Sequence, residues 1–187
     1  MKKFTTLFLV VCFCAICSCA EKNVSGAFFI TNTLKTTLMP VIAIEQPLLY
    51  KQKLTVAYDG NENTVTAVLN ISSDNITVIA FTDFGRIFAI TYQNSGIRYE
   101  LSPFAPSAEK FMPMYIINDI QLIYYPLSAI EKYLPAGITV EEKTVNGNKF
   151  RFFYQDSDNF STVRYNTDLS INFTNTQRNY SYTIEEI

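Results

Sequence analysis

Residues 63–101 read NTVTAVLNISSDNITVIAFTDFGRIFAITYQNSGIRYEL, and their pattern decides the fold class. Apolar and polar residues alternate in short runs that are rich in Val, Ile, Thr and aromatic side chains, which is typical of half-buried β-strands. The runs are separated by Ser72-Ser73-Asp74, Asp83-Phe84-Gly85 and Asn94-Ser95-Gly96, whose residues favour turns. The stretch therefore predicts a meander of antiparallel hairpins in which each strand has one apolar face.

The same pattern continues on both sides of this stretch. One more strand precedes it, and a second series follows Pro135, with Asn146-Gly147 as a strong signal for a type I′ hairpin turn. The expected strands, about ten in all, cover residues 50–58, 63–71, 75–82, 86–93, 97–101, 138–145, 149–155, 160–165, 169–175 and 180–184.

Between the two series the apolar period changes to that of a helix. The residues that recur at spacings of four and three are Ile116, Ile120, Ile123, Leu127, Ile130 and Leu134. Asn118 and Gln121 have the spacing of a capping box, and Ser128 and Glu131 repeat it. Pro126 suits the first turn of a new helix. We therefore expect residues 112–134 to form two short helices, or one sharply kinked helix. These helices would be a lid on the concave side of the sheet.

The N-terminal segment has the features of a lipoprotein signal. Lys2 and Lys3 precede an apolar run at residues 7–16, which is typical of a secretory signal peptide and about half as long as the ~20 residues of a membrane span. The following Ile16-Cys17-Ser18-Cys19-Ala20 resembles a bacterial lipobox, which places cleavage before Cys19 and acyl chains on that cysteine. Ala20 is not the Asp that retains lipoproteins in the inner membrane, so an outer-membrane anchor facing the periplasm is favoured. The alternative is an ordinary secreted protein.

These signals divide the chain into three segments. Residues 1–18 are the expected signal peptide, and residues 19–47 are a lipidated N-terminus, tether and lead-in segment that contains Pro40 and Pro47. Residues 48–187 form a single β domain with the helical lid at 112–134. We expect part of the lead-in segment to pack on this domain.

The residue types that are missing exclude most catalytic chemistry. The chain contains no histidine, and its four cysteines all lie at or before Cys19. This removes Ser-His-Asp and Cys-His catalysis and the commonest zinc ligands. Without Lys2 and Lys3, 13 basic residues stand against 17 acidic residues, a formal charge of −4, and nothing indicates a nucleic-acid partner. We expect a protein that is not an enzyme and that has no catalytic residue, metal or cofactor.

The aromatic content indicates an interior that is incompletely filled. The chain has 15 Phe and 12 Tyr, while only 17% of its residues are charged. One twisted sheet that faces a short helical segment offers more apolar surface than such helices cover, so we expect an apolar cavity. The residues expected to line the cavity or its lid are Phe84, Phe88, Ile90, Met112, Met114, Ile116, Ile120, Ile123, Tyr125 and Leu127.

A cluster of polar residues in the helical segment has two interpretations. Asn118, Asp119 and Gln121 lie near the expected start of a helix, where such side chains cap free backbone N–H groups. The alternative is that they are polar groups at the mouth of a ligand site. We favour capping.

Two pieces of the chain carry a resemblance to a known family. FGRIFAITY at 84–92 with IRYE at 97–100, and NDIQLIYYPL at 118–127, resemble uncharacterised lipoproteins of Gram-negative bacteria. These are often encoded with aryl-polyene or fatty-acid-like biosynthesis genes and are similar to the outer-membrane lipoprotein receptor LolB. In the family an Asp-x-Gln-Leu run leads to Trp-Pro, and here Tyr125 replaces the Trp but remains aromatic and amphipathic.

The resemblance spans roughly residues 45–187 and implies a LolA/LolB-like fold. That fold is mainly β, an open antiparallel half-barrel with short helices inserted midway as a lid over a cavity that holds acyl chains. It implies a membrane-anchored carrier or receptor for lipid, acyl or lipoprotein cargo, with a periplasmic carrier protein as a further partner. The alternative function is a structural or assembly lipoprotein that binds a partner protein through a sheet edge, with its hollow collapsed.

Overall fold

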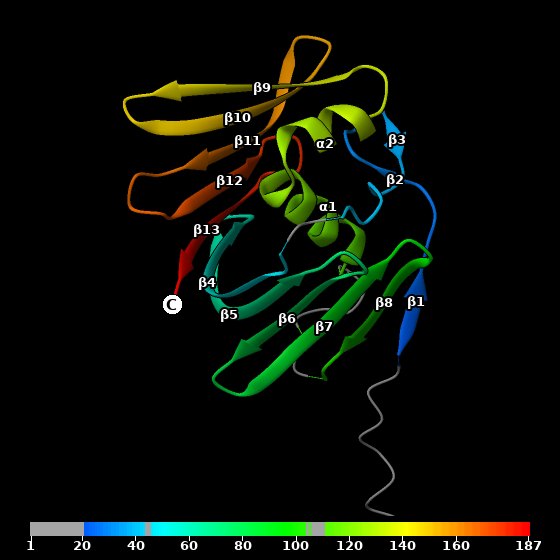
Figure 1. The fold of residues 1–187 in the computed structure, drawn as a ribbon. Helices are drawn as coiled ribbons and strands as arrows, with labels where there is room; N and C mark the ends of the chain where they lie inside the picture. Colours follow the sequence, from blue (N-terminus) through cyan, green and yellow to red (C-terminus); the bar gives the residue numbers. More distant parts are fainter. Residues whose placement is uncertain (1–20, 44–45, 104, 106–110) are drawn as a thin grey trace, which may run out of the picture.

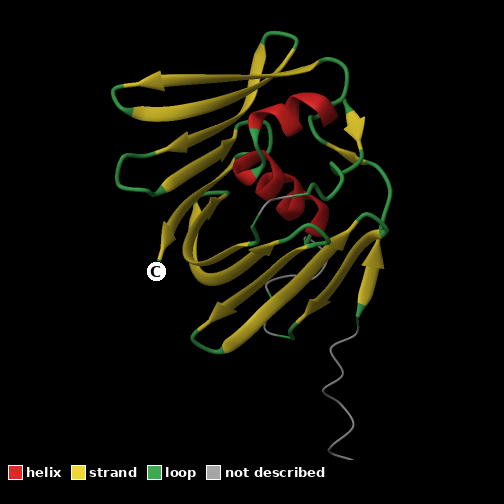
Figure 2. Ribbon diagram, viewed as in Figure 1, coloured by secondary structure: helices red, strands yellow, loops and turns green. Residues whose placement is uncertain are grey.

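The fold consists of two β-meanders joined by two helices. In the computed structural model the described residues are 21–43, 46–103, 105 and 111–187. The first meander contains β4 (Leu48–Tyr58), β5 (Asn61–Ile71), β6 (Ile76–Thr82), β7 (Gly85–Gln93) and β8 (Gly96–Leu101). After α1 (Pro113–Tyr124) and α2 (Leu127–Tyr133), the second contains β9 (Ile138–Val145), β10 (Asn148–Gln155), β11 (Asp158–Tyr165), β12 (Ile171–Asn175) and β13 (Tyr180–Glu186). A mainly β fold with helices inserted midway is confirmed (Figure 2).

One antiparallel sheet of eleven strands contains both meanders. Its order is β1-β8-β7-β6-β5-β4-β13-β12-β11-β10-β9, so β1 (Lys22–Val24) and β9 are its two edges and the sheet is not closed. Figure 1 shows it curling around the two helices as an open half-barrel. All ten predicted strands form. The eleventh, β1, was missed because three residues are too short to show a period, and it pairs with β8.

The long strand β4 joins the two meanders into one sheet. It pairs with β5 along its whole length, from Leu48 opposite Ile71 to Tyr58 opposite Asn61. On its other side it pairs with the last strand, β13, which is far away in the sequence. Because β5 pairs with β6 only from Thr66 onward, the first part of β5 extends beyond its neighbour at this end of the sheet.

The helical segment forms two short helices, the first of the two predicted alternatives, but not with the predicted caps. The α1 helix begins earlier, with Met112 as N-cap and Pro113 in its first turn, and the N-cap of α2 is Pro126. Neither cap makes a side-chain hydrogen bond. Asn118 and Gln121 are buried inside α1. The capping-box interpretation is therefore wrong, because prolines whose fixed φ suits a helix start define both beginnings.

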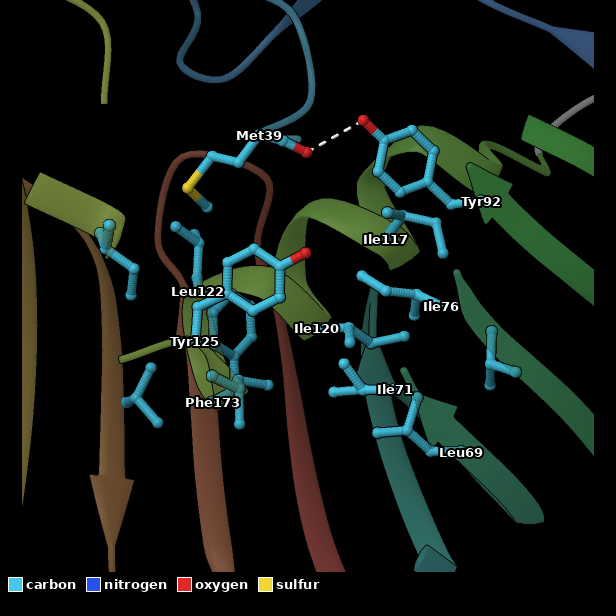
Figure 3. Close-up of a cluster of buried hydrophobic side chains, with 14 of the residues drawn as sticks. Met39, Leu69, Ile71, Ile76, Tyr92, Ile117, Ile120, Leu122, Tyr125 and Phe173 are labelled. Atoms are coloured by element: carbon cyan, nitrogen blue, oxygen red, sulfur yellow. Dashed lines mark hydrogen bonds between the residues drawn. The ribbon is translucent and has the colours of Figure 1, made fainter. Parts of the chain in front are cut away.

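The lead-in segment lies across the side of α1 that faces away from the sheet. We call residues 28–42 the strap, and its Phe28, Ile30 and Met39 are buried in the core. The Met39 carbonyl accepts a hydrogen bond from Gln121 Nε2 at 2.6 Å. It also accepts one from the Tyr92 hydroxyl at 2.9 Å, which Figure 3 shows. The strap therefore encloses α1, which accounts for a helix that is buried on more than one face.

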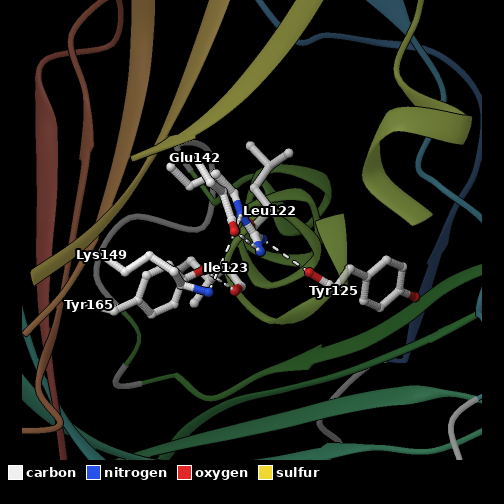
Figure 4. Close-up of polar contacts among 7 residues, drawn as sticks. Leu122, Ile123, Tyr125, Glu142, Lys149 and Tyr165 are labelled. Atoms are coloured by element: carbon white, nitrogen blue, oxygen red, sulfur yellow. Dashed lines mark hydrogen bonds and ion pairs between the residues drawn. The ribbon is translucent and has the colours of Figure 1, made fainter. Parts of the chain in front are cut away.

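The C-terminal end of α1 is held by side chains from the second meander (Figure 4). The guanidinium of the buried Arg151 donates from Nη1 to the carbonyl oxygens of Leu122 at 2.7 Å and Tyr125 at 3.0 Å. It also forms an ion pair with Glu142 at 2.7 Å. The Tyr165 hydroxyl donates to the Ile123 carbonyl at 2.5 Å. These bonds satisfy carbonyl groups that a helix end leaves without partners, and they make α1 a fixed wall rather than a hinged lid.

Replacing Arg151 tests this anchor. In Arg151→Met we expect a loss of about 3–5 kcal/mol in the free energy of unfolding, because Glu142 and the helix carbonyls lose a buried partner. Urea unfolding followed by circular dichroism measures it. The matched control is Arg86→Met, whose ion pair with Glu100 at 2.7 Å is solvent-exposed, and we expect a loss below about 1 kcal/mol. Equal losses in the two variants would contradict the anchoring role.

Candidate functional site

A cavity of about 380 Å³ lies between the concave face of the first meander and α1. Alternate residues of three strands form its sheet wall. These residues are Leu54 and Val56 of β4, Ala67 and Leu69 of β5, and Val78 and Ala80 of β6. Their spacing of two puts them on the same face of the sheet. The volume lies within the range of about 300–1,000 Å³ that is usual for ligand pockets.

The opposite wall comes from α1, with β13 at one side. Ile116, Ile120 and Ile123 of α1 line the cavity at helical spacing, and Ile184 of β13 lines it beside them. Aliphatic side chains thus form most of both walls. The cavity is suited to an apolar ligand.

Exposure changes along the strands and shows where the cavity opens. Gln52, Leu69 and Val78 are buried at one end, with at most 6% of their surface exposed. At the other end Tyr58 is 53% exposed and Asn63 is also exposed, and both still line the cavity. The mouth therefore lies toward the turn between β4 and β5, where β5 extends beyond β6. Gln52, Leu69 and Val78 mark the deep end.

Asp119 of α1 is the one acidic or basic residue among the described residues that line this cavity. It is 2% exposed, and its Oδ2 accepts hydrogen bonds from the hydroxyls of Tyr180 at 2.7 Å and Tyr182 at 3.0 Å. Its Oδ1 has a longer contact of 3.4 Å with Asn118 Nδ2. Burial outweighs these hydrogen bonds and raises the pKa of Asp119 from 3.8 to about 7. A carboxyl group that titrates near neutral pH thus faces an aliphatic cavity.

A second polar group lies at the deep end. Gln52 Nε2 donates to the Tyr124 hydroxyl at 2.7 Å, and both residues line the cavity. The Tyr124 ring stacks on Tyr50 with 5.4 Å between centroids, and burial raises the pKa of its hydroxyl. This pair gives the deep end a neutral polar contact.

The structure brings some of the predicted site residues together in this cavity. Phe88, Ile116, Ile120 and Ile123 line it. Its neighbour Ile87 lines it too, although adjacent residues of a regular strand point to opposite faces. A register shift opposite Ala80 and Phe81 leaves Ile87 without a partner and turns it inward.

The other predicted site residues lie elsewhere. Phe84 is 87% exposed in the turn before β7, and Met112 is 55% exposed before α1. Ile90 and Tyr125 are buried in the core (Figure 3 labels Tyr125), and Leu127 begins α2. Met114 lines a different hollow, of about 350 Å³, beside the strap and β8.

Sequence reasoning missed the role of Asp119 in the cavity. Asp119 was interpreted as part of a cap, although polar groups at a ligand site were the stated alternative. The available signal was its position three residues after Ile116 and one before Ile120, on the apolar face of the helix. A carboxyl group on such a face has to lie against apolar residues or a binding site.

Cys19 lies outside the described residues. Among the residues that the structure describes, no group of three or more His, Cys, Asp or Glu could hold a metal ion. No helix in the described part of the chain is long and apolar enough to cross a membrane.

Comparisons with known proteins give a family but no function. The model of a family described as "Protein of unknown function (DUF3261)" matches residues 49–187. No curated protein matches the chain. Among solved structures, a DUF1329 family protein from Desulfovibrio piger is similar, with 10% identity and a TM-score of 0.36 over 76% of this chain and 84% of the other.

Replacing Asp119 should change how stability depends on pH. Because the folded-state pKa of Asp119 is raised from 3.8 to about 7, its contribution to stability is full below pH 4 and is lost as the pH rises through 7. We expect Asp119→Asn to weaken this dependence and to be more stable than the wild type at pH 8, by on the order of a few kcal/mol. Urea unfolding between pH 4 and 8 measures both proteins.

The control for this experiment is Asp74→Asn, which makes the same charge change at an exposed position between β5 and β6. Its stability should follow the wild-type curve. Parallel curves for wild type and Asp119→Asn would show that Asp119 does not titrate in this range in the folded protein.

Proposed function

The chain belongs to the DUF3261 family of proteins of unknown function, and we propose that it is a non-enzymatic, membrane-anchored lipoprotein that binds an acyl or similar apolar chain in its cavity. The single observation that carries this proposal is the open aliphatic cavity of about 380 Å³ beside α1. Ligand pockets of this size are lined mostly by apolar side chains of this kind. The fixed position of α1 supports a cavity that exists before the ligand arrives.

The proposed location is the outer membrane, with the domain facing the periplasm. It rests on the lysine-led apolar run and the Ser18-Cys19 pair of the sequence. An anchor of this kind holds the domain beside a lipid surface from which apolar chains are exchanged. A periplasmic carrier protein is the proposed partner in that exchange.

Exchange takes place through the mouth rather than by opening α1. The helix is held at its C-terminal end by Arg151, at its centre by the bonds of Tyr180 and Tyr182 to Asp119, and on its outer side by the strap. A chain that enters at the end of the cavity near Tyr58 breaks none of these bonds. We therefore propose that a chain enters there with its tail toward Leu69.

The alternative, a structural lipoprotein that binds a partner through a sheet edge, depends on a collapsed hollow. The open cavity supports chain binding instead. The edge strand β9 also carries Glu141 and Lys143, which form an exposed ion pair at 2.9 Å. Charges at an edge disfavour the addition of another strand.

A larger side chain inside the cavity should weaken binding. Val65 lines the cavity, so in Val65→Phe we expect the affinity for the neutral fluorescent probe N-phenyl-1-naphthylamine to fall at least tenfold. The control is Val68→Phe on the same strand, whose side chain faces the opposite side of the sheet and should change the affinity less than threefold. Probe fluorescence titration measures both, and native mass spectrometry of the purified protein detects chains already bound. Equal affinities in the two variants would exclude this cavity as the binding site.

Affinity should also rise with chain length until the cavity is full. Each buried methylene contributes about 0.8 kcal/mol, so two more carbons tighten binding roughly 15-fold. Displacement of the probe by 1-octanol, 1-decanol and 1-dodecanol measures this trend. A flat series would contradict burial of the chain.

A further inference from the structure

The cavity has an unusual charge balance for a site that binds lipid chains. Asp119 is the charged side chain among the described residues that line it, and no lysine or arginine lines it there. The nearby Arg178 uses its guanidinium elsewhere, because it donates to the carbonyls of Ile30 at 2.9 Å and of Phe29 and lies over the Tyr115 ring at 4.2 Å. An anionic head group inside the cavity would therefore have no lysine or arginine of the described lining to pair with.

Asp119 also keeps hydrogen-bonding capacity after its own contacts are counted. Among the described residues, its Oδ2 receives two tyrosine hydroxyls, whereas the contact of Oδ1 is the 3.4 Å one with Asn118. An ionised carboxylate accepts about two hydrogen bonds at each oxygen. A ligand group that donates a hydrogen bond can thus bind to Oδ1, and a hydroxyl group can also accept one when Asp119 is protonated.

The position of Asp119 places such a group on the mouth side of the cavity. Its partners Tyr180 and Tyr182 pair with Tyr58 and Val56 of β4, near the open end. The deep end, with Gln52 and Tyr124, lies farther along α1, because five residues of helix from Asp119 to Tyr124 span about 7.5 Å. A chain whose polar group lies at Asp119 therefore directs its tail into the aliphatic interior.

We propose that the cavity selects uncharged chains that carry a hydroxyl group, which donates to Asp119, and rejects chains whose head group is an anion. Tyr180 and Tyr182 act as positioning residues, because they hold Oδ2 and leave Oδ1 for the ligand. The inference rests on the proposed function, since it names the class of chain that the same cavity takes. Its physical basis is repulsion: two carboxylates cannot both be ionised at short distance in an apolar surrounding without a large energetic penalty.

The test compares two ligands of equal chain length. Displacement of N-phenyl-1-naphthylamine by 1-dodecanol and by dodecanoate gives two dissociation constants for each protein. The measurement is made at pH 8, above the pKa of about 7 of Asp119 in the protein without ligand. In the wild type we expect dodecanol to bind at least tenfold more tightly than dodecanoate. In Asp119→Asn this ratio should fall to about threefold or less, mainly because dodecanoate binds more tightly to an amide that repels no anion.

The surface variant Asp74→Asn is the control, because it removes the same charge outside the cavity and should keep the wild-type ratio. A carboxylate is more soluble than an alcohol in any case, so the change of the ratio between variants is the decisive measurement. Asp119→Ser provides a second removal of the carboxylate if Asp119→Asn does not fold, and it should collapse the ratio in the same way.

The outcomes separate this inference from the proposed function. If neither the probe nor dodecanol binds the wild type, the proposed function is wrong, and this inference falls with it. If dodecanol binds and its homologues show the expected dependence on length, but the ratio is the same in wild type, Asp119→Asn and Asp119→Ser, the function stands and selection by Asp119 is overturned. If the ratio falls in the two Asp119 variants but not in Asp74→Asn, the result supports selection by Asp119.

Discussion

The carbonyl groups at the end of α1 need hydrogen-bond donors inside an apolar interior, and the donors that they find fix the position of this helix. Arg151 and Tyr165 of the second meander supply these donors. An unsatisfied buried carbonyl is costly, so the helix end and these strands have to stay together. Glu142 balances the charge of Arg151 and makes its burial tolerable. The position of α1 is thereby fixed relative to one half of the sheet.

The cavity follows from that fixed position. Arg151 of the second meander binds the end of α1, and the strap covers the outer side of the helix. The first meander continues the sheet from β13 through β4, and its concave face forms the wall opposite α1. Space therefore remains between α1 and the concave face of β4 to β7. Because small residues such as Ala67 and Ala80 point into this space, side chains do not fill it.

The chemistry of the cavity combines a large apolar surface with few polar groups. In such a surrounding one carboxyl group has more influence than it has in water, because neighbouring charges are weakly screened. Asp119 is held by two tyrosines and lies where a chain would enter, so it is placed to sort ligands by their head groups. The tyrosine-rich last strand thus serves both the sheet and the cavity.

The amino-acid sequence was sufficient to predict the local elements: the strands, their turns, a helical segment and the apolar face of each. Period two in a strand and 3.6 in a helix are properties of the local chain, and in the structure Phe88, Ile116, Ile120 and Ile123 line the cavity from such faces. What covers each face depends on the tertiary structure. Ile90 and Phe88 share a face of β7, yet only Phe88 meets the cavity, and Asp119 turned from an expected cap into a buried acid. These outcomes depend on contacts such as β4 with β13 and Arg151 with α1, whose partners are far apart in the sequence and leave no periodic signal.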